Sequence, residues 1–141
     1  MILPDANVLI PAFRHDAARH AVCRSWLEAT ARGDARFGIS PLVLAAVIRI
    51  TTNPRIFPEP SSLVDAIGFA EGVLRQANAV IVEPGDRHFG IFTRLCLETR
   101  TTGPTVSDAY YAALAIEAGA EWITFDRDFA RFPGLRWSAP S

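Results

Sequence analysis

The residues best suited to chemistry are four aspartates that fall at the ends of apolar segments. One follows the apolar stretch 2–4, two follow the apolar stretch 122–124, and one begins an alanine-rich segment. Clustered carboxylates repel one another, so a cluster is stable at neutral pH only when protons or cations neutralise it. Oxygen ligands of this kind bind Mg²⁺ or Mn²⁺, which keep several waters. A metal site is therefore predicted from Asp5, Asp108, Asp126 and Asp128.

Each acid also has a simpler explanation when it is taken alone. Asp5 is a possible N-cap for a helical turn at Asn7. Asp108 near a helix start complements the helix dipole, and Asp126 and Asp128 are common turn residues. Four acids that converge on one edge of a sheet favour the metal site over these separate explanations.

Short apolar stretches alternate with helical patterns along the whole chain. This alternation predicts an α/β fold in which helices cover both faces of a short parallel sheet of four or five strands. A single domain over residues 1–141 is expected. Strands are expected at 2–5, 36–40, 79–82, 122–124 and 135–137, and helices at 7–13, 17–32, 42–51, 61–76, 84–100 and 105–117.

Helix boundaries are predicted from capping residues. Asp16, Ser40 with Pro41, and Ser61 are expected to begin three helices, and Thr105 or Ser107 a fourth. Glycines are expected to end two helices, at Gly33 and Gly119. The helix from 42 is apolar on nearly every face as far as Arg49, so it is expected to be mostly buried. Because strand ends and helix starts meet at one edge of a parallel sheet, Asp5, Asp126 and Asp108 are expected to lie together.

Composition excludes several classes of function. The chain has 141 residues, 50% of them hydrophobic, and a formal net charge of −1, so no strong positive field indicates a nucleic-acid partner. All 14 basic residues are arginine, which excludes P-loop phosphate binding and Schiff-base chemistry, both of which need lysine. Cys23 and Cys96 match no zinc or redox motif. The start of the chain resembles no signal peptide and no stretch is long enough to span a membrane, so a cytoplasmic location is expected.

Several motifs together resemble one family. Asp5-Ala-Asn7 follows the first strand, Ser107-Asp-Ala-Tyr-Tyr begins a helix, and Thr124-Phe-Asp-Arg-Asp128 follows a strand. With Ile48–Arg55 and Phe132–Leu135, these segments resemble the PIN-domain ribonucleases. The closer similarity is to the VapC-type toxins of bacterial toxin–antitoxin pairs, especially the mycobacterial group. The resemblance covers the chain almost end to end.

The resemblance implies a PIN-like three-layer fold and an Mg²⁺- or Mn²⁺-dependent endoribonuclease that cuts RNA by metal-activated water. It also implies inhibition by a VapB-type antitoxin, a homodimer, and an oligomer with the antitoxin. On the matching positions, Asp5 and Asp108 would be the principal metal ligands, Asp126 would complete the catalytic site, and Asp128 would support the metal. Asn7 and Thr124 would orient these carboxylates.

The chain departs from the family pattern in one helix. Many PIN nucleases carry a glutamate in the segment that here contains Ala45 and Ala46, and no acid occurs between Ser40 and Pro58. One carboxylate fewer weakens a second metal ion most. We therefore hypothesise one tightly held metal, with any second ion arriving with RNA.

Arginines are the candidates for contact with the RNA phosphates, since a forked guanidinium suits phosphate. Arg49 is favoured because its helix is otherwise apolar, and Arg127 because it stands between two of the acids. The tryptophans, Trp137 among them, are interpreted as core and dimer-interface side chains.

Two alternatives to the nuclease stay open. One is a PIN-like module that binds RNA or a partner but cleaves little. The other is a Mg²⁺-dependent phosphatase, whose DxD motif would require an acid at Asn7.

Overall fold

Five short parallel strands form one sheet in the computed structural model, which describes residues 1–141. The strands lie in the order β3-β2-β1-β4-β5. Pro4 of β1 lies beside Ile123 of β4, and Ile39 of β2 lies beside Ile81 of β3. The bounds are β1 Ile2–Pro4, β2 Phe37–Ile39, β3 Ala79–Ile81, β4 Glu121–Ile123 and β5 Trp137–Ser138.

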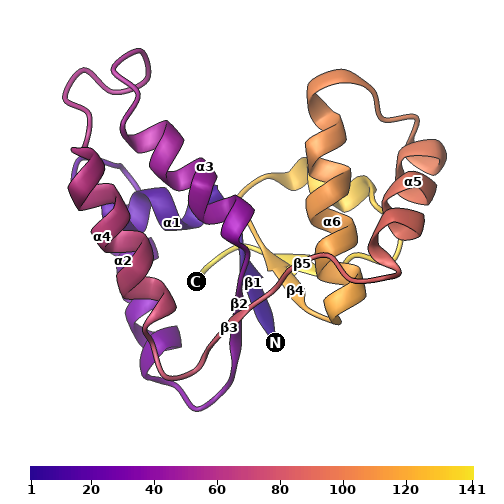
Figure 1. The fold of residues 1–141 in the computed structure, drawn as a ribbon, viewed down its shortest axis with the longest axis horizontal. Coiled ribbons are helices and arrows are strands. Elements are labelled where there is room, and N and C mark those ends of the chain that lie inside the picture. The colour runs from indigo at the N-terminus through magenta and orange to yellow at the C-terminus, as the bar shows by residue number, and fades with distance from the viewer.

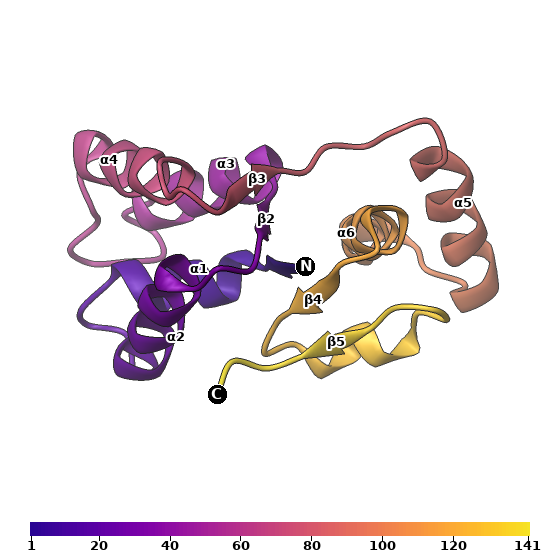
Figure 2. The same ribbon diagram turned by 90° about the horizontal axis from the view of Figure 1, so that it is seen from below.

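Six α-helices cover the two faces of this sheet. Helices α1 to α4 gather on one face, and α5 and α6 lie on the other (Figures 1 and 2). The helices are α1 Ala6–Phe13, α2 His20–Arg32, α3 Pro41–Thr51, α4 Leu63–Leu74, α5 His88–Thr99 and α6 Val106–Ala118. Short 3₁₀ turns span η1 Gly103–Thr105 and η2 Arg127–Arg131. The predicted three-layer α/β fold is therefore confirmed.

The order of the strands creates a point where the chain changes direction in the sheet. From β1 the chain builds β2 and β3 on one side, and it then returns to place β4 and β5 on the other. In open α/β sheets, ligands bind outside the carboxyl ends of the strands at such a switch point. Here the switch point lies between β1 and β4, so the segments after Pro4 and Ile123 border it.

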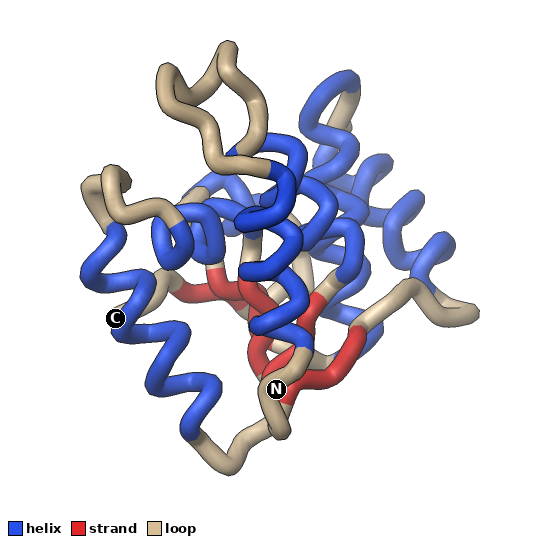
Figure 3. The backbone as a smooth tube through the Cα atoms, turned by 60° about the vertical axis from the view of Figure 1, so that its left-hand side comes forward, coloured by secondary structure: helices blue, strands red, loops and turns tan.

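The core lies between the sheet and its helices, and Figure 3 shows the strands gathered at the centre of the molecule. Trp122 of β4 is fully buried and packs between Tyr111 and Phe129, with ring centroids 5.4 and 5.5 Å away. Gly38 fits the crowded β2 strand because a Cβ there would lie 2.7 Å from a methyl carbon of Val82. None of the helices has the length and apolar character to span a membrane.

Three predicted helix starts are wrong. Helix α2 begins at His20 rather than at Ala17, because Asp16 pairs with the guanidinium of Arg14 at 2.6 Å instead of capping the helix. Helix α4 is capped by Ser62, whose hydroxyl accepts from the Asp65 N–H at 3.1 Å, and not by the preceding serine. Helix α5 begins at His88, after an irregular segment that ends in a turn at Asp86 and Arg87, rather than at Pro84.

Helix α6 has no side-chain cap, which also differs from the prediction. The hydroxyls of Thr105 and Ser107 donate back to the carbonyls of Thr102 and Pro104, so the 3₁₀ turn leads directly into the helix. The predicted ends at Gly33 and Gly119 are confirmed.

Helix α3 is capped by Ser40 as predicted, with the hydroxyl accepting from the Val43 N–H at 3.4 Å. The expectation that α3 is mostly buried is wrong. Only one face of α3 packs against α1 and α4, so Leu42 and Ala45 are exposed. A helix that looks apolar all round in the sequence therefore has an open side.

Candidate functional site

Asp5 lies at the switch point of the sheet, directly after β1. Its backbone N–H donates to the Ile123 carbonyl at 2.9 Å, which continues the β1–β4 pairing past the end of the strand. Asp5 occupies the N-cap position of α1, yet its side chain makes no capping hydrogen bond there. Its carboxylate instead accepts from the hydroxyl of Thr124 at 2.8 Å. Capping therefore does not explain this acid.

Thr124 and Asn7 hold Asp5 and the β4 loop in one hydrogen-bonded network. Thr124 is fully buried, and its hydroxyl accepts from the Asn7 side-chain amide at 3.0 Å and from the Asp126 N–H at 3.1 Å. The side-chain carbonyl of Asn7 accepts from the Phe125 N–H at 3.2 Å. These contacts fix Asp5 and the β4 loop relative to each other.

Burial raises the pKa of Asp5 from 3.8 to about 6. The Thr124 hydroxyl and the nearby N–H groups of Ala6 and Asn7 lower this pKa, and the charge of Asp108 raises it further. Asp5 has no ion-pair partner within 4 Å. A buried carboxylate of this kind gains from a bound proton or cation.

Asp108 lies in the first turn of α6, and its pKa depends on burial and on nearby charges. Burial raises the pKa of Asp108, the charges of Asp126 and Asp128 raise it too, and the charge of Arg131 lowers it. Arg131 lies 3.5 Å from the Asp108 carboxylate. The fold thus brings Asp108 close enough for its charge to act on Asp5 and for the charges of Asp126 and Asp128 to act on Asp108.

The four acids do not form a ready-made cage. No three acidic, histidine or cysteine side chains lie close enough together to hold a metal ion as they stand. One oxygen of Asp126 accepts from the Asp128 N–H at 2.9 Å. Asp126 therefore caps the turn η2, and its charge also raises the pKa of Asp108. An Mg²⁺ ion needs only one or two carboxylates and keeps its waters, so the pair Asp5 and Asp108 fits this ion.

Arg49 projects from the last turn of α3, near the same edge of the sheet. Its charge lowers the pKa of Tyr111, while burial and then the charge of Asp5 raise it. The charges of Arg49 and Asp5 therefore both act on Tyr111. Arg127 is exposed and forms no ion pair with the acids on either side of it.

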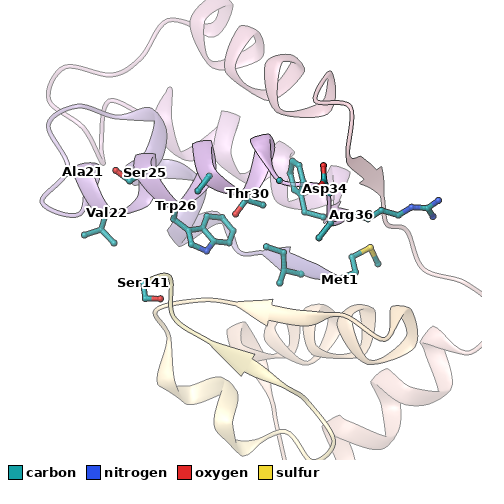
Figure 4. Close-up of a pocket in the computed structure, with 14 residues that line it drawn as sticks. Met1, Ala21, Val22, Ser25, Trp26, Thr30, Asp34, Arg36 and Ser141 are labelled. Atoms are coloured by element: carbon teal, nitrogen blue, oxygen red, sulfur yellow. The ribbon is translucent and has the colours of Figure 1, made fainter.

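A hollow of about 930 Å³ lies elsewhere, at the amino ends of β1 and β2. Figure 4 shows Trp26 and Thr30 of α2 on one side of it, with Met1 and Ser141 nearby. None of the four aspartates lines this hollow. Its position makes it separate from the acidic edge.

The sequence of the chain matches the PIN domain family model over residues 2–135. This chain belongs to the PIN-domain family. The PIN domain is 41% identical over 140 residues to ribonuclease VapC43 of Mycobacterium tuberculosis, covering 99% of this chain and 95% of that protein. It is 39% identical over 140 residues to ribonuclease VapC25 of the same organism, covering 99% of each.

Solved structures show the same fold. The PIN domain superposes on a chain of VapBC2 from Rickettsia felis bound to a promoter DNA fragment, with a TM-score of 0.73, 18% identity and full coverage of both chains. It also superposes on VapC20 of M. tuberculosis, described as a sarcin–ricin loop cleaving toxin, with a TM-score of 0.65 and 18% identity. That match covers 96% of this chain and 99% of the other.

Two residues of the acidic edge were missed at the level of sequence. Tyr111 belongs to the motif that begins at Ser107, but the effect of the Asp5 charge on it depends on how α6 packs. Arg131 follows Asp128 by three residues, a spacing that brings a side chain back over a short helical turn. That spacing would indicate a pair with Asp128, whereas the partner in the structure is Asp108, 23 positions away in the sequence.

Proposed function

We propose that this PIN domain is an Mg²⁺- or Mn²⁺-dependent endoribonuclease that acts as the toxin of a toxin–antitoxin pair. The observation that carries the proposal is the half-buried Asp5 carboxylate at the switch point, which has no cationic partner and whose pKa is raised by the charge of Asp108. The identity to VapC ribonucleases over nearly the whole chain supports the same activity.

Asp5 and Asp108 would hold the metal ion, with Asp126 completing the site and Asp128 supporting it. When bound, the ion would supply Lewis-acid chemistry, activating a water for attack on phosphorus and stabilising charge on the leaving oxygen. In the hydrolysis a new phosphorus–oxygen bond forms from water and the ester bond to one ribose oxygen breaks. One product then ends in a phosphate and the other in a hydroxyl.

The other residues of the edge orient the acids and bind the substrate. Thr124 and Asn7 keep Asp5 in one orientation through their hydrogen bonds. Arg49 and Arg127, which are both exposed, would contact phosphates of the RNA. Arg131 shares the charge of Asp108 and would have to give way in part as a cation binds.

The test is cleavage of a panel of structured RNAs by purified protein with Mn²⁺. Asp5→Asn and Asp108→Asn should each reduce cleavage to the uncatalysed background. Asp34→Asn is the matched control, because this acid is exposed at the opposite edge of the sheet. If both site variants cleave as fast as the parent protein, the proposal is wrong.

A second candidate is a PIN module that binds RNA or a partner and cleaves little. The absence of a ready-made three-ligand group and the lack of an acid in α3 favour it. RNA binding by the parent protein without Mn²⁺-dependent cleavage would support this module instead of the nuclease.

The proposed partner is a small VapB-type antitoxin that occupies the acidic edge and blocks it. Several of the solved structures with this fold are complexes of VapB and VapC proteins or toxin–antitoxin complexes. Induced expression of the chain alone should arrest growth, and coexpression with a small adjacent reading frame should restore it. Unchanged growth with soluble, folded protein would contradict the toxin assignment.

A further inference from the structure

A second hollow lies beside the acidic edge, at the carboxyl ends of β4 and β5. Its volume is about 600 Å³, within the range of roughly 300–1,000 Å³ that is usual for ligand pockets. It is separate from the acids themselves but directly adjacent, because Phe125 and Arg127 flank Asp126 in the sequence. Its main lining residues are Arg19, Phe125, Arg127, Trp137, Ser138 and Ala139.

Two arginines at this hollow have no carboxylate partner. The ion pairs of the molecule use Arg14, Arg24, Arg94 and Arg131, whereas Arg19 and Arg127 take part in none. Arg127 stands between two aspartates, yet its guanidinium lies more than 4 Å from both carboxylates and borders the hollow. Two unpaired guanidinium groups at one hollow suit a phosphate, to which they can donate forked hydrogen bonds.

Flat surfaces line the same hollow. The Arg19 guanidinium lies over the Phe125 ring, 4.0 Å from its centroid, so this side chain is held against the wall. Trp137 of β5 is half-buried and is also one of the residues that line the hollow. Unstacked RNA bases stack on aromatic rings and on guanidinium planes. The hollow thus combines groups that donate hydrogen bonds to a phosphate with flat surfaces on which a base can stack. A nucleotide needs both.

The wall of the hollow is fixed by the network that holds Asp5. The Phe125 N–H donates to the side-chain carbonyl of Asn7. The side-chain amide of Asn7 donates to the Thr124 hydroxyl, and this hydroxyl donates to the Asp5 carboxylate. We propose that this hollow binds one nucleotide of single-stranded RNA, next to the nucleotide whose phosphodiester is cut at the acids. This inference rests on the proposed ribonuclease function and adds a specific substrate contact to it.

RNA fits the hollow better than a protein segment does. An acidic side chain of a partner would satisfy the two guanidinium groups but would not use the indole face beside them. A nucleotide uses both, because each one carries a phosphate and a flat base. The test must therefore distinguish binding of RNA from binding of a protein partner.

The test measures binding of a fluorescent ten-nucleotide oligouridylate in EDTA, with Asp5→Asn present throughout to prevent cleavage. Arg19→Gln should weaken binding about tenfold, which is the usual loss for one stacked or phosphate-bound nucleotide. Arg24→Gln is the matched control, since it removes the same charge from the exposed face of α2, where Arg24 pairs with Glu28. This control should bind as the parent does.

Tryptophan fluorescence gives an independent readout at the hollow. Oligouridylate should quench the emission, Trp137→Phe should abolish most of the quenching, and Trp26→Phe should retain it. Trp26 lies at the other hollow, at the amino ends of the strands (Figure 4). This measurement does not depend on the fold tolerating the loss of an arginine.

Equal affinities for Arg19→Gln and Arg24→Gln, with quenching that survives Trp137→Phe, would overturn the inference. So would an Arg19→Gln variant that loses antitoxin binding while its RNA binding is unchanged. If Arg19→Gln and Trp137→Phe bind RNA normally while the wild-type protein cleaves RNA, the inferred nucleotide site is wrong and the ribonuclease proposal stands. If the wild-type protein binds through Trp137 but never cleaves, the ribonuclease function fails and the binding site stands.

Discussion

Thr124 links more parts of the candidate site than any other side chain. Its single hydroxyl donates to Asp5 and accepts from both Asn7 and the Asp126 N–H. We expect Thr124→Val to weaken Mn²⁺ binding by about 10- to 100-fold, the usual loss when a group that orients a metal ligand is removed. The affinity can be measured by calorimetry.

A matched control separates this effect from general loss of stability. Thr51→Val removes another fully buried threonine hydroxyl, one that donates to the Val47 carbonyl within α3. Thr51→Val should lower stability but leave the Mn²⁺ affinity unchanged. If the two variants lose affinity equally, Thr124 has no specific role at the metal.

Asp5 makes stability depend on pH when no metal is bound. Its folded-state pKa of about 6 lies above the ordinary 3.8, so the folded protein holds this proton more tightly than the unfolded chain does. The free energy of unfolding should therefore fall as pH rises from about 4 to about 6, by at most about 3 kcal/mol. Urea unfolding in EDTA at a series of pH values would measure this fall.

Asp5→Asn should remove most of that pH dependence and should be more stable than the parent protein at pH 7. The amide keeps a similar shape and carries no charge to bury. An unchanged slope in the variant would assign the pH dependence to other groups.

At the scale of elements, the glycine that ends α6 controls where the chain turns into β4. Gly119 has a φ of 65°, a conformation that costs other residues roughly 1 kcal/mol. Gly119→Ala should therefore destabilise the fold by about 1 kcal/mol, as measured by chemical denaturation. Gly68→Ala, in the exposed interior of α4 with no atom within 4 Å of the added carbon, should instead stabilise by about 0.5–1 kcal/mol.

The elements were predictable from the sequence where the local pattern was decisive. Apolar strands followed by acids gave the positions of β1 and β4, and Ser40-Pro41 gave the start of α3. The caps predicted at Asp16 and Ser61 are wrong because the choice between neighbouring caps depends on tertiary partners. Here the guanidinium of Arg14 binds the side chains of both residues. The ion pair of Arg131 with Asp108 and the place of Tyr111 beside Asp5 required the fold itself.

At the scale of the whole molecule, metal binding should raise thermal stability. A ligand that binds only the folded state at 100 times its Kd stabilises by about 2.7 kcal/mol. Mn²⁺ should therefore raise the Tm of the parent protein and of Asp34→Asn, and should leave that of Asp108→Asn nearly unchanged. Differential scanning fluorimetry with and without Mn²⁺ would measure the shift.

The number of metal ions can be measured in the same preparation. Because α3 offers no acid at Ala45 or Ala46, we expect calorimetry of the free protein to find one tight Mn²⁺ site. Two equally tight sites would contradict this expectation and would require ligands beyond the Asp5 and Asp108 pair.

The hydrogen bond from Thr124 to Asp5 spans 119 positions of the sequence. A ribosome making this protein therefore releases Asp5 long before Thr124, the residue that donates to its carboxylate. Helices α1 to α4 can fold before β4, the strand that completes the acidic edge, has been synthesised. We therefore expect a growing chain that has not yet reached β4 to cleave no RNA.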